Sequence, residues 1–242
     1  AGDYLRLHLH DDLMISKKTG PTDLVTQMDQ QVQKDLVEKI KHRYPEDRIF
    51  AEEDGLRSPI SEGAVWVIDP IDGTNNFVTQ KEDFAVMVAY FEEGIGQFGL
   101  IYDVMRDHLF YGGGEFPVYR NEFELTPFVD QPLENFLIAS NVGMLEKNDW
   151  GMADLGMASL GIRVYGSAGI SFSKILSGGI LAYFSYIWPW DYAAAAIMGE
   201  QLGYTVLNLN GDKPNYQTVE PIMMVPKVKL TEIQTYLKKG RS

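Results

Sequence analysis

The 242-residue sequence has no cysteine, only four histidines, no long hydrophobic run and far fewer basic than acidic residues. The absence of cysteine excludes disulfides and thiol catalysis, and it suits a cytoplasmic protein. The histidines are scattered without the spacing of zinc ligands, so they give no reason to expect a zinc site. No stretch approaches the roughly 18 apolar residues of a membrane-spanning helix, so we expect no membrane partner.

The charge balance gives a formal net charge of −13. It argues against nucleic acid as a partner, because a phosphate backbone is bound by a basic surface. It also argues against an anionic substrate, unless bound divalent cations reverse the potential in an acidic cleft. Surface acids that merely keep the protein soluble are the alternative explanation.

The most informative stretch holds two carboxylates at the end of a short apolar run. Residues 64–68 are typical of a buried strand, and Asp69 and Asp72 follow three residues apart. Pro70 restricts the backbone, so we expect a stiff turn. Two acids held beside an apolar core are unfavourable unless a cation lies between them. An ordinary turn that leaves through Gly73 is the alternative.

Two other acidic segments also come directly after short apolar stretches. Residues 52–54, Glu-Glu-Asp, follow the strand candidate at 48–51, and Asp191 lies shortly after the apolar stretch at 179–184. Acids at the ends of rigid elements are typical of functional sites. All the candidate ligands are oxygen atoms, which favours a hard divalent cation such as magnesium.

The hydrophobic pattern predicts an α/β protein in which the second half alternates strand and helix. We expect an N-terminal subdomain at 1–130 that carries most of the acidic candidates, and a C-terminal subdomain at 131–242 that supplies Asp191, both in one structural unit. The predicted helices lie at 26–43, 149–159, 168–176 and 191–201, and the predicted strands lie near 49 and at 65–68, 84–91, 95–104, 109–111, 136–140, 163–165 and 180–186.

Several motifs in order resemble the signature of the inositol monophosphatase family, within the lithium-sensitive, magnesium-dependent phosphatases that include fructose-1,6-bisphosphatase. The matching residues are Lys18, 23–26, Asp29, Glu52-Glu53, 69–77 (Asp-Pro-Ile-Asp-Gly-Thr-Asn-Asn-Phe) and Trp190-Asp191. The resemblance implies a five-layer α/β/α/β/α sandwich that acts as a homodimer on a small phosphate monoester, through metal-activated water. The family has a longer N-terminal helix, so we expect that the start of this chain is trimmed.

The resemblance also implies a role for each candidate residue. Glu52, Asp69 and the carbonyl of Ile71 would hold one ion, and Asp69, Asp72 and Asp191 a second, with two or three Mg²⁺ in all. Catalysis would fall to Glu52, Thr74 and Asp29, the last two relaying a proton from a metal-bound water. Other candidate substrate contacts follow from backbone N–H groups at predicted helix starts, with Lys18 and Asp191 beside them. The candidate amides are those of Gly73, Thr74, Gly166, Ser167, Ala168 and Gly169.

Each of these roles has a structural alternative. Thr74 is also a plausible helix N-cap, and Asp29 a plausible exposed helix acid. Lys18 is also a plausible surface lysine, and residues 166–168 also fit a plain strand-to-helix turn.

Phe184 bears on the substrate. Counting back from Asp191 without gaps, it occupies the position where animal family members carry a glutamate that contacts inositol. A phenyl ring accepts no hydrogen bond from a hydroxyl group, but it can stack on a flat group. We therefore expect broad monoesterase activity, including aromatic or nucleotide substrates. The alternative is that Phe184 points into the core and that Ser185 or Tyr186 faces the ligand.

Rival functions make different demands. A two-carboxylate glycosidase needs no metal, so a chelator separates it from a magnesium-dependent phosphatase. A calcium loop requires further acids before Gly73, and these are absent. Phosphatases of the same superfamily that act on fructose bisphosphate, nucleotide bisphosphates or NADP share the predicted metal site. A non-catalytic metal-binding protein is the remaining alternative.

Overall fold

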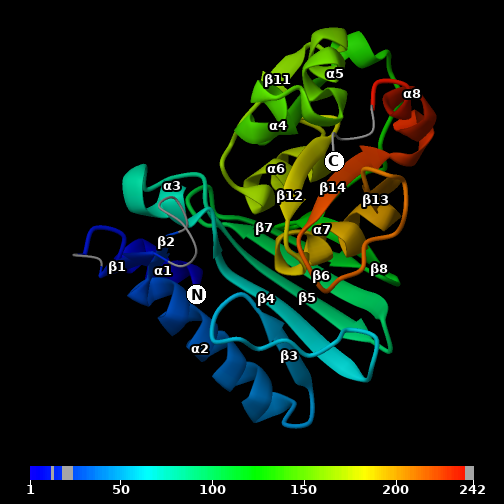
Figure 1. Ribbon diagram of the computed structural model, residues 1–242. Helices are drawn as coiled ribbons and strands as arrows, with labels where there is room; N and C mark the ends of the chain where they lie inside the picture. The colour runs from blue at the N-terminus through cyan, green and yellow to red at the C-terminus, as the bar shows by residue number, and fades with distance from the viewer. Residues whose placement is uncertain (12–13, 18–23, 238–242) are drawn as a thin grey trace.

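A computed structural model of the chain describes residues 1–11, 14–17 and 24–237. Two β-sheets and three helical layers alternate, which confirms the expected five-layer α/β/α/β/α sandwich (Figure 1). Helix α2 (Gln27–Arg43) covers the outer face of the first sheet, and α6 (Ala168–Leu176) and α7 (Pro189–Gln201) lie between the sheets. Helices α4 (Val142–Glu146) and α5 (Met152–Ala158) cover the second sheet on its far side.

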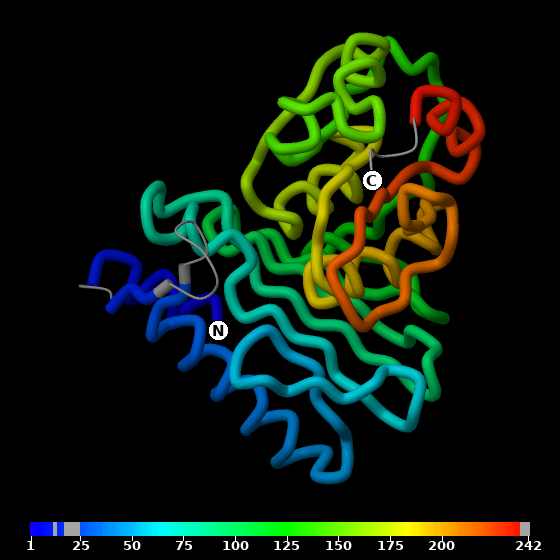
Figure 2. Tube along the Cα trace, in the orientation of Figure 1, coloured from blue at the N-terminus to red at the C-terminus, as the bar shows by residue number. Residues whose placement is uncertain are grey.

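The first sheet has seven strands and is built before residue 125, as the blue-to-green part of the trace in Figure 2 shows. Its first two strands are parallel and the others antiparallel, including the predicted hairpin of β5 and β6. In sheet order the strands are β3 (Arg48–Ala51), β4 (Ala64–Asp72), β5 (Ala85–Glu92), β6 (Ile95–Asp103), β7 (His108–Gly113), β8 (Phe116–Arg120) and β9 (Phe123–Glu124).

The second sheet has five strands, three of them parallel to one another. The other two strands form an antiparallel pair after α7. The hydrophobic pattern of the sequence did not predict these two strands. In sheet order the strands are β11 (Gly161–Arg163), β10 (Leu137–Ser140), β12 (Tyr183–Ile187), β14 (Glu220–Pro226) and β13 (Tyr204–Asn208). The division of the chain into subdomains at residue 130 stays a prediction.

Helix α7 is the centre of the core. Its alanines at 193–195 are at most 1% exposed, because sheets lie on both sides of the helix. The backbone of Gly99 on β6 approaches so closely that a Cβ there would lie 2.4 Å from the carbonyl oxygen of Ala194. Small residues on both elements therefore let α7 lie close to the first sheet, and this places Asp191 beside the end of β4.

The segment at 149–159 differs from its prediction. A single helix was expected, but a 3₁₀ turn at Asp149–Gly151 precedes α5; Trp150 within this turn has a φ of 55°, and Gly151 at the junction has a φ of 75°. A left-handed residue breaks the helical hydrogen-bond ladder, so the one-helix prediction is wrong. The strand expected at 163–165 is also displaced and lies at Gly161–Arg163.

The remaining elements are short. None of the helices in the described ranges is long and apolar enough to cross a membrane. These elements are helices α1 (Gly2–Leu7), α3 (Thr74–Thr79) and α8 (Leu230–Gln234), the paired strands β1 (Ile15–Lys17) and β2 (Leu24–Thr26), and 3₁₀ turns at Leu133–Asn135 and Lys227–Lys229.

Candidate active site

The two acids of the central motif lie on β4, not on a turn after it. The strand runs through Asp72, and its pairing with β5 shifts between Asp69, opposite Met87, and Asp72, opposite Ala85. Residues three apart on a regular strand point to opposite faces, but one extra residue in a bulge restores the same face. The bulge therefore turns both carboxylates toward the helices of the middle layer.

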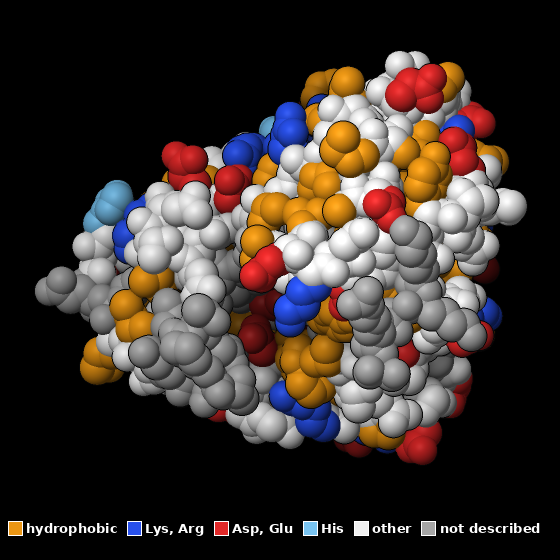
Figure 3. Space-filling model, turned by 45° about the horizontal axis from the view of Figure 1, so that its top comes forward, with side chains coloured by type: hydrophobic (Ala, Val, Ile, Leu, Met, Phe, Trp, Pro, Cys, Tyr) orange, Lys and Arg blue, Asp and Glu red, His pale blue; other side chains and the backbone are white. Residues whose placement is uncertain are grey.

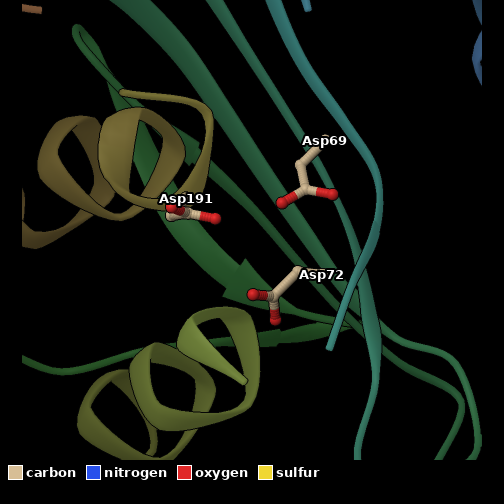
Figure 4. A group of neighbouring side chains, drawn as sticks. All are labelled: Asp69, Asp72 and Asp191. Atoms are coloured by element: carbon tan, nitrogen blue, oxygen red, sulfur yellow. The ribbon is translucent and has the colours of Figure 1, made fainter. Parts of the chain in front are cut away.

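Asp191 completes the cluster from the first turn of α7. Pro189 begins the helix, and Asp191 Oδ2 accepts a hydrogen bond from the backbone N–H of Trp188 at 2.7 Å. Carboxylate oxygens of Asp69, Asp72 and Asp191 lie within 4.8 Å of one another. Figure 4 shows the first two projecting from β4 toward the third on α7. The space-filling view in Figure 3 shows acidic side chains deep in a hollow of the face that it draws.

The cluster is electrostatically unfavourable without a cation. Burial raises the pKa of Asp69 well above its usual range, and the charges of Glu52, Asp72 and Asp191 raise it further. Burial likewise raises the pKa of Asp191 well above its usual range, with Asp72 and Glu52 as further causes. The three carboxylates converge, and it is unfavourable for all of them to be ionised at once without a cation. Converging oxygen ligands of this kind suit a hard divalent cation. The residues present therefore fit a magnesium ion.

Glu52 lies at the edge of this cluster. It comes directly after β3, and its backbone N–H donates to the carbonyl of Ile68 at 3.2 Å, which brings it beside the end of β4. Its charge is the second cause, after burial, of the raised pKa of Asp69. Its neighbour Glu53 is buried, whereas Asp54 is exposed. The role of Glu52 as a ligand stays a prediction.

Thr74 and Asp29 are in contact, as the resemblance implied. Gly73, with a φ of 85°, precedes α3, so Thr74 is the first residue of the helix and not its N-cap. Its Oγ1 lies 3.1 Å from Asp29 Oδ1 and 3.0 Å from the carbonyl oxygen of Ile71. Asp29 is fully buried, so the exposed-acid alternative is wrong. Its other oxygen accepts hydrogen bonds from the N–H and hydroxyl of Thr26 at 2.8 and 2.7 Å.

The segment at 166–169 contacts Asp72 through one hydroxyl and two backbone amides. The Ser167 hydroxyl donates to Asp72, as do the amides of Ala168 at 2.9 Å and Gly169 at 2.8 Å. Burial raises the pKa of Asp72, and these three hydrogen bonds lower it in part. The amides of Ala168 and Gly169, which were expected to reach the substrate, therefore hold Asp72 instead. The expected contact of the Ser167 amide with substrate stays a prediction.

One other predicted substrate contact comes out differently. Phe184 is completely buried in a core cluster with Ile138, Leu181 and Met223, so its predicted contact with substrate is wrong and the ring points into the core, as the alternative held. The second part of that alternative, that Ser185 or Tyr186 faces the ligand, stays a prediction. The strand alternates, so Ser185 lies on the opposite face, where its Oγ accepts a hydrogen bond from Asn141 at 3.1 Å. Lys18 lies outside the described residues, and the contacts of Gly73 and Gly166 with substrate stay predictions.

Comparison with known proteins finds relatives along nearly the whole chain. The sequence profile described as the inositol monophosphatase family matches residues 1–239. An inositol-1-monophosphatase of Bacillus subtilis (strain 168) is 36% identical over 218 residues, which span 88% of this chain and 82% of that protein. Human inositol monophosphatase 2 is 29% identical over 224 residues, which span 87% of this chain and 77% of that protein.

Solved structures show the same fold. A crystal structure of an IMPase/NADP phosphatase complexed with Mg²⁺ and phosphate superposes with a TM-score of 0.90 at 26% identity, covering 99% of this chain and 93% of that one. A staphylococcal IMPase-I complexed with products gives a TM-score of 0.88 at 26% identity, with the same coverage.

Proposed function

The chain belongs to the inositol monophosphatase family and is a phosphoric monoester hydrolase, and from this premise we propose that Asp69, Asp72 and Asp191 form its magnesium site. The convergence of these three carboxylates within 4.8 Å carries the proposal. Asp69 and Asp72 are buried and Asp191 is partly buried, and their crowding favours protonation without a cation; a divalent cation removes that conflict.

Two ions account for the arrangement of ligands, and a third is compatible with it. Glu52, Asp69 and the Ile71 carbonyl would hold one ion, and Asp69, Asp72 and Asp191 the other. Bound magnesium lowers the pKa of water and offsets the charge of the phosphoryl group. Asp72 is held for this task by donors on α6, and Asp191 by the Trp188 amide.

The chain's own proton acceptor is the Thr74–Asp29 pair. Thr74 Oγ1 has one proton and two acceptors, Asp29 Oδ1 at 3.1 Å and the Ile71 carbonyl at 3.0 Å. It can therefore pass its proton to Asp29 while it accepts another from a water in the site. Asp29 is fixed by Thr26 and keeps one oxygen aimed at Thr74. The amides of Gly73 and Thr74, with Lys18, Gly166 and Asp191, would contact the substrate.

The substrate class that we propose is small phosphate monoesters of sugars and nucleotides. Solved structures of relatives were obtained with NADP and Ca²⁺, with 2′AMP and with inositol monophosphate. Burial of Phe184 removes the reason to expect stacking on that residue, so a preference for aromatic substrates no longer follows from it. We also propose a cytoplasmic homodimer, which is supported by the family resemblance and, for the compartment, by the absence of cysteine.

A phosphate-release assay on purified protein tests this function. The panel contains inositol 1-phosphate, fructose 1,6-bisphosphate, 2′AMP, NADP and glycerol 2-phosphate, each with magnesium and with excess chelator. We expect hydrolysis of at least one ester with magnesium, none with chelator, and none by Asp69→Asn. Asp35→Asn, on α2 outside the cluster, is the matched control and should retain activity. Turnover that survives chelation would favour the metal-free hydrolase, and inactivity on every ester with tight magnesium binding would favour a non-catalytic metal-binding protein.

A further inference from the structure

Arg57 was not among the candidates from sequence, yet it contacts both sides of the metal site. The segment after β3 folds back on that strand, with Ala51 N–H donating to the Leu56 carbonyl at 2.9 Å and Phe50 paired with Arg57. The Arg57 guanidinium then donates to the carbonyl oxygens of Ala51 and, at 3.3 Å, Glu52. Its planar fork therefore fixes the backbone from which the Glu52 carboxylate projects.

The other contact of Arg57 is with the residue before Asp191. The guanidinium carbon lies 4.6 Å from the centre of the Trp190 ring, and 5.6 Å from that of Phe50. Trp190 is almost fully buried and also stacks on Trp188, with ring centres 4.8 Å apart and planes 11° apart. A cation over an indole face is the most favourable of the cation–π contacts. The start of α7, which carries Asp191, is thereby tied to the segment that carries Glu52.

We propose that Arg57 is a positioning residue that sets the spacing between Glu52 and Asp191 for metal binding. Glu52 follows a strand of the first sheet, whereas Asp191 belongs to a helix of the middle layer. Sequence-distant ligands must be held within a few tenths of an ångström to coordinate one ion cluster. Arg57 joins the two segments through hydrogen bonds to one and a stacked contact with the other. The inference rests on the magnesium site of the proposed function.

Arg57 can affect magnesium affinity in two opposite ways, through its charge and through the positions of the metal ligands. A cation beside Glu52 and Glu53 repels magnesium, so its removal would tighten metal binding if charge were its only contribution. Loss of positioning has the opposite effect, because displaced ligands bind metal more weakly. Arg57→Lys separates the two contributions: lysine keeps the charge but lacks the planar fork and its stacking.

Isothermal titration of metal-free protein with MgCl₂ tests the proposal without relying on activity. We expect that both Arg57→Gln and Arg57→Lys weaken magnesium binding, by about tenfold, the lower end of the range for residues that orient metal ligands. In assays, the magnesium concentration for half-maximal rate should rise while kcat at saturating magnesium changes less. Arg43→Gln is the matched control, because Arg43 lies over Tyr44 at 5.4 Å outside the site.

The outcomes are distinguishable. Unchanged affinity in Arg57→Lys, or tighter binding in Arg57→Gln, overturns the positioning role and leaves the proposed function intact. Wild-type protein that binds no magnesium overturns both. Arg57 is exposed, but its hydrogen bonds and its contact with Trp190 are lost in the variants, so their metal-free Tm should fall by only a few degrees. If Arg57→Gln melts early, Arg57→Lys alone decides the question.

Discussion

Replacement of Asp69 by asparagine should stabilise the metal-free protein while it abolishes turnover. Asp69 is 1% exposed and has Asp72 and Asp191 oxygens within 4.8 Å. At that separation and an effective dielectric constant of about 20, two full charges repel by about 3 kcal/mol. Protons bound to the cluster relieve part of this repulsion, so we expect a gain of about 1–3 kcal/mol. For a chain of this size that corresponds to a rise in Tm of about 2–12 °C.

The gain should depend on pH in a direction that the raised pKa values determine. Burial and neighbouring charges raise the pKa values of Asp69 and Asp191 above the ordinary aspartate value of about 3.9. The folded cluster therefore binds more protons than the unfolded chain, and metal-free stability falls as pH rises above that value through the folded pKa values. Below it the carboxyls are neutral in both states. The advantage of Asp69→Asn should therefore be largest near pH 8 and shrink toward pH 4.

Thermal melts in chelator at several pH values measure this difference, with Asp35→Asn as the control for loss of an acid elsewhere. Saturating magnesium should invert the order, because the ion stabilises the wild type and binds the variant poorly. An equal or lower Tm for Asp69→Asn at pH 8 in chelator would refute the electrostatic account of the cluster. So would a gain that persists unchanged at pH 4.

Three further outcomes follow from the same geometry. Thr74→Ala should lower kcat about a hundredfold or more with a smaller change in KM. Thr74→Ser should retain most activity, because its hydroxyl can still reach Asp29. An effect of Thr74→Ala on KM alone would contradict the role of Thr74 in proton transfer. Phe184→Leu should lower the free energy of unfolding by about 1 kcal/mol in denaturant titrations. It should leave the ratio of kcat/KM between inositol and nucleotide esters unchanged, and a shifted ratio would place the ring at the substrate. Lithium chloride should inhibit turnover, as the family resemblance implies; a resistant enzyme would contradict that expectation.

The sequence was most informative where local rules and tertiary structure agree. Helix α2 begins after Thr26, whose side chain accepts a hydrogen bond from the Met28 amide as an N-cap residue does. The alanine-rich helix α7 and the β5–β6 hairpin also lie where periodicity and propensity predict them. The contact between Thr74 and Asp29 came from the motif resemblance, because no local rule relates residues 45 positions apart.

The sequence was least informative where backbone geometry decides the direction of a side chain. Asp69 and Asp72 suggest a turn around Pro70, but the strand continues and a bulge aligns the two acids. Phe184 was assigned to the site by counting residues back from Asp191. Successive residues of a strand point to opposite faces, so an error of one position in that count moves a side chain from the site to the core. The left-handed Trp150 is equally invisible to helical periodicity, which carries no information about φ.

The helices of the middle layer also offset part of the repulsion within the acidic cluster. The amides at the start of α6 donate to Asp72, and Asp191 lies in the first turn of α7. A helix N-terminus carries a partial positive charge, so both helices of the middle layer direct their favourable ends at the carboxylates. These helix dipoles offset part of the repulsion between the carboxylates, but they do not change the net negative charge of the cluster. Backbone amides thus orient Asp72 and Asp191, while the negative charge that remains favours a bound cation.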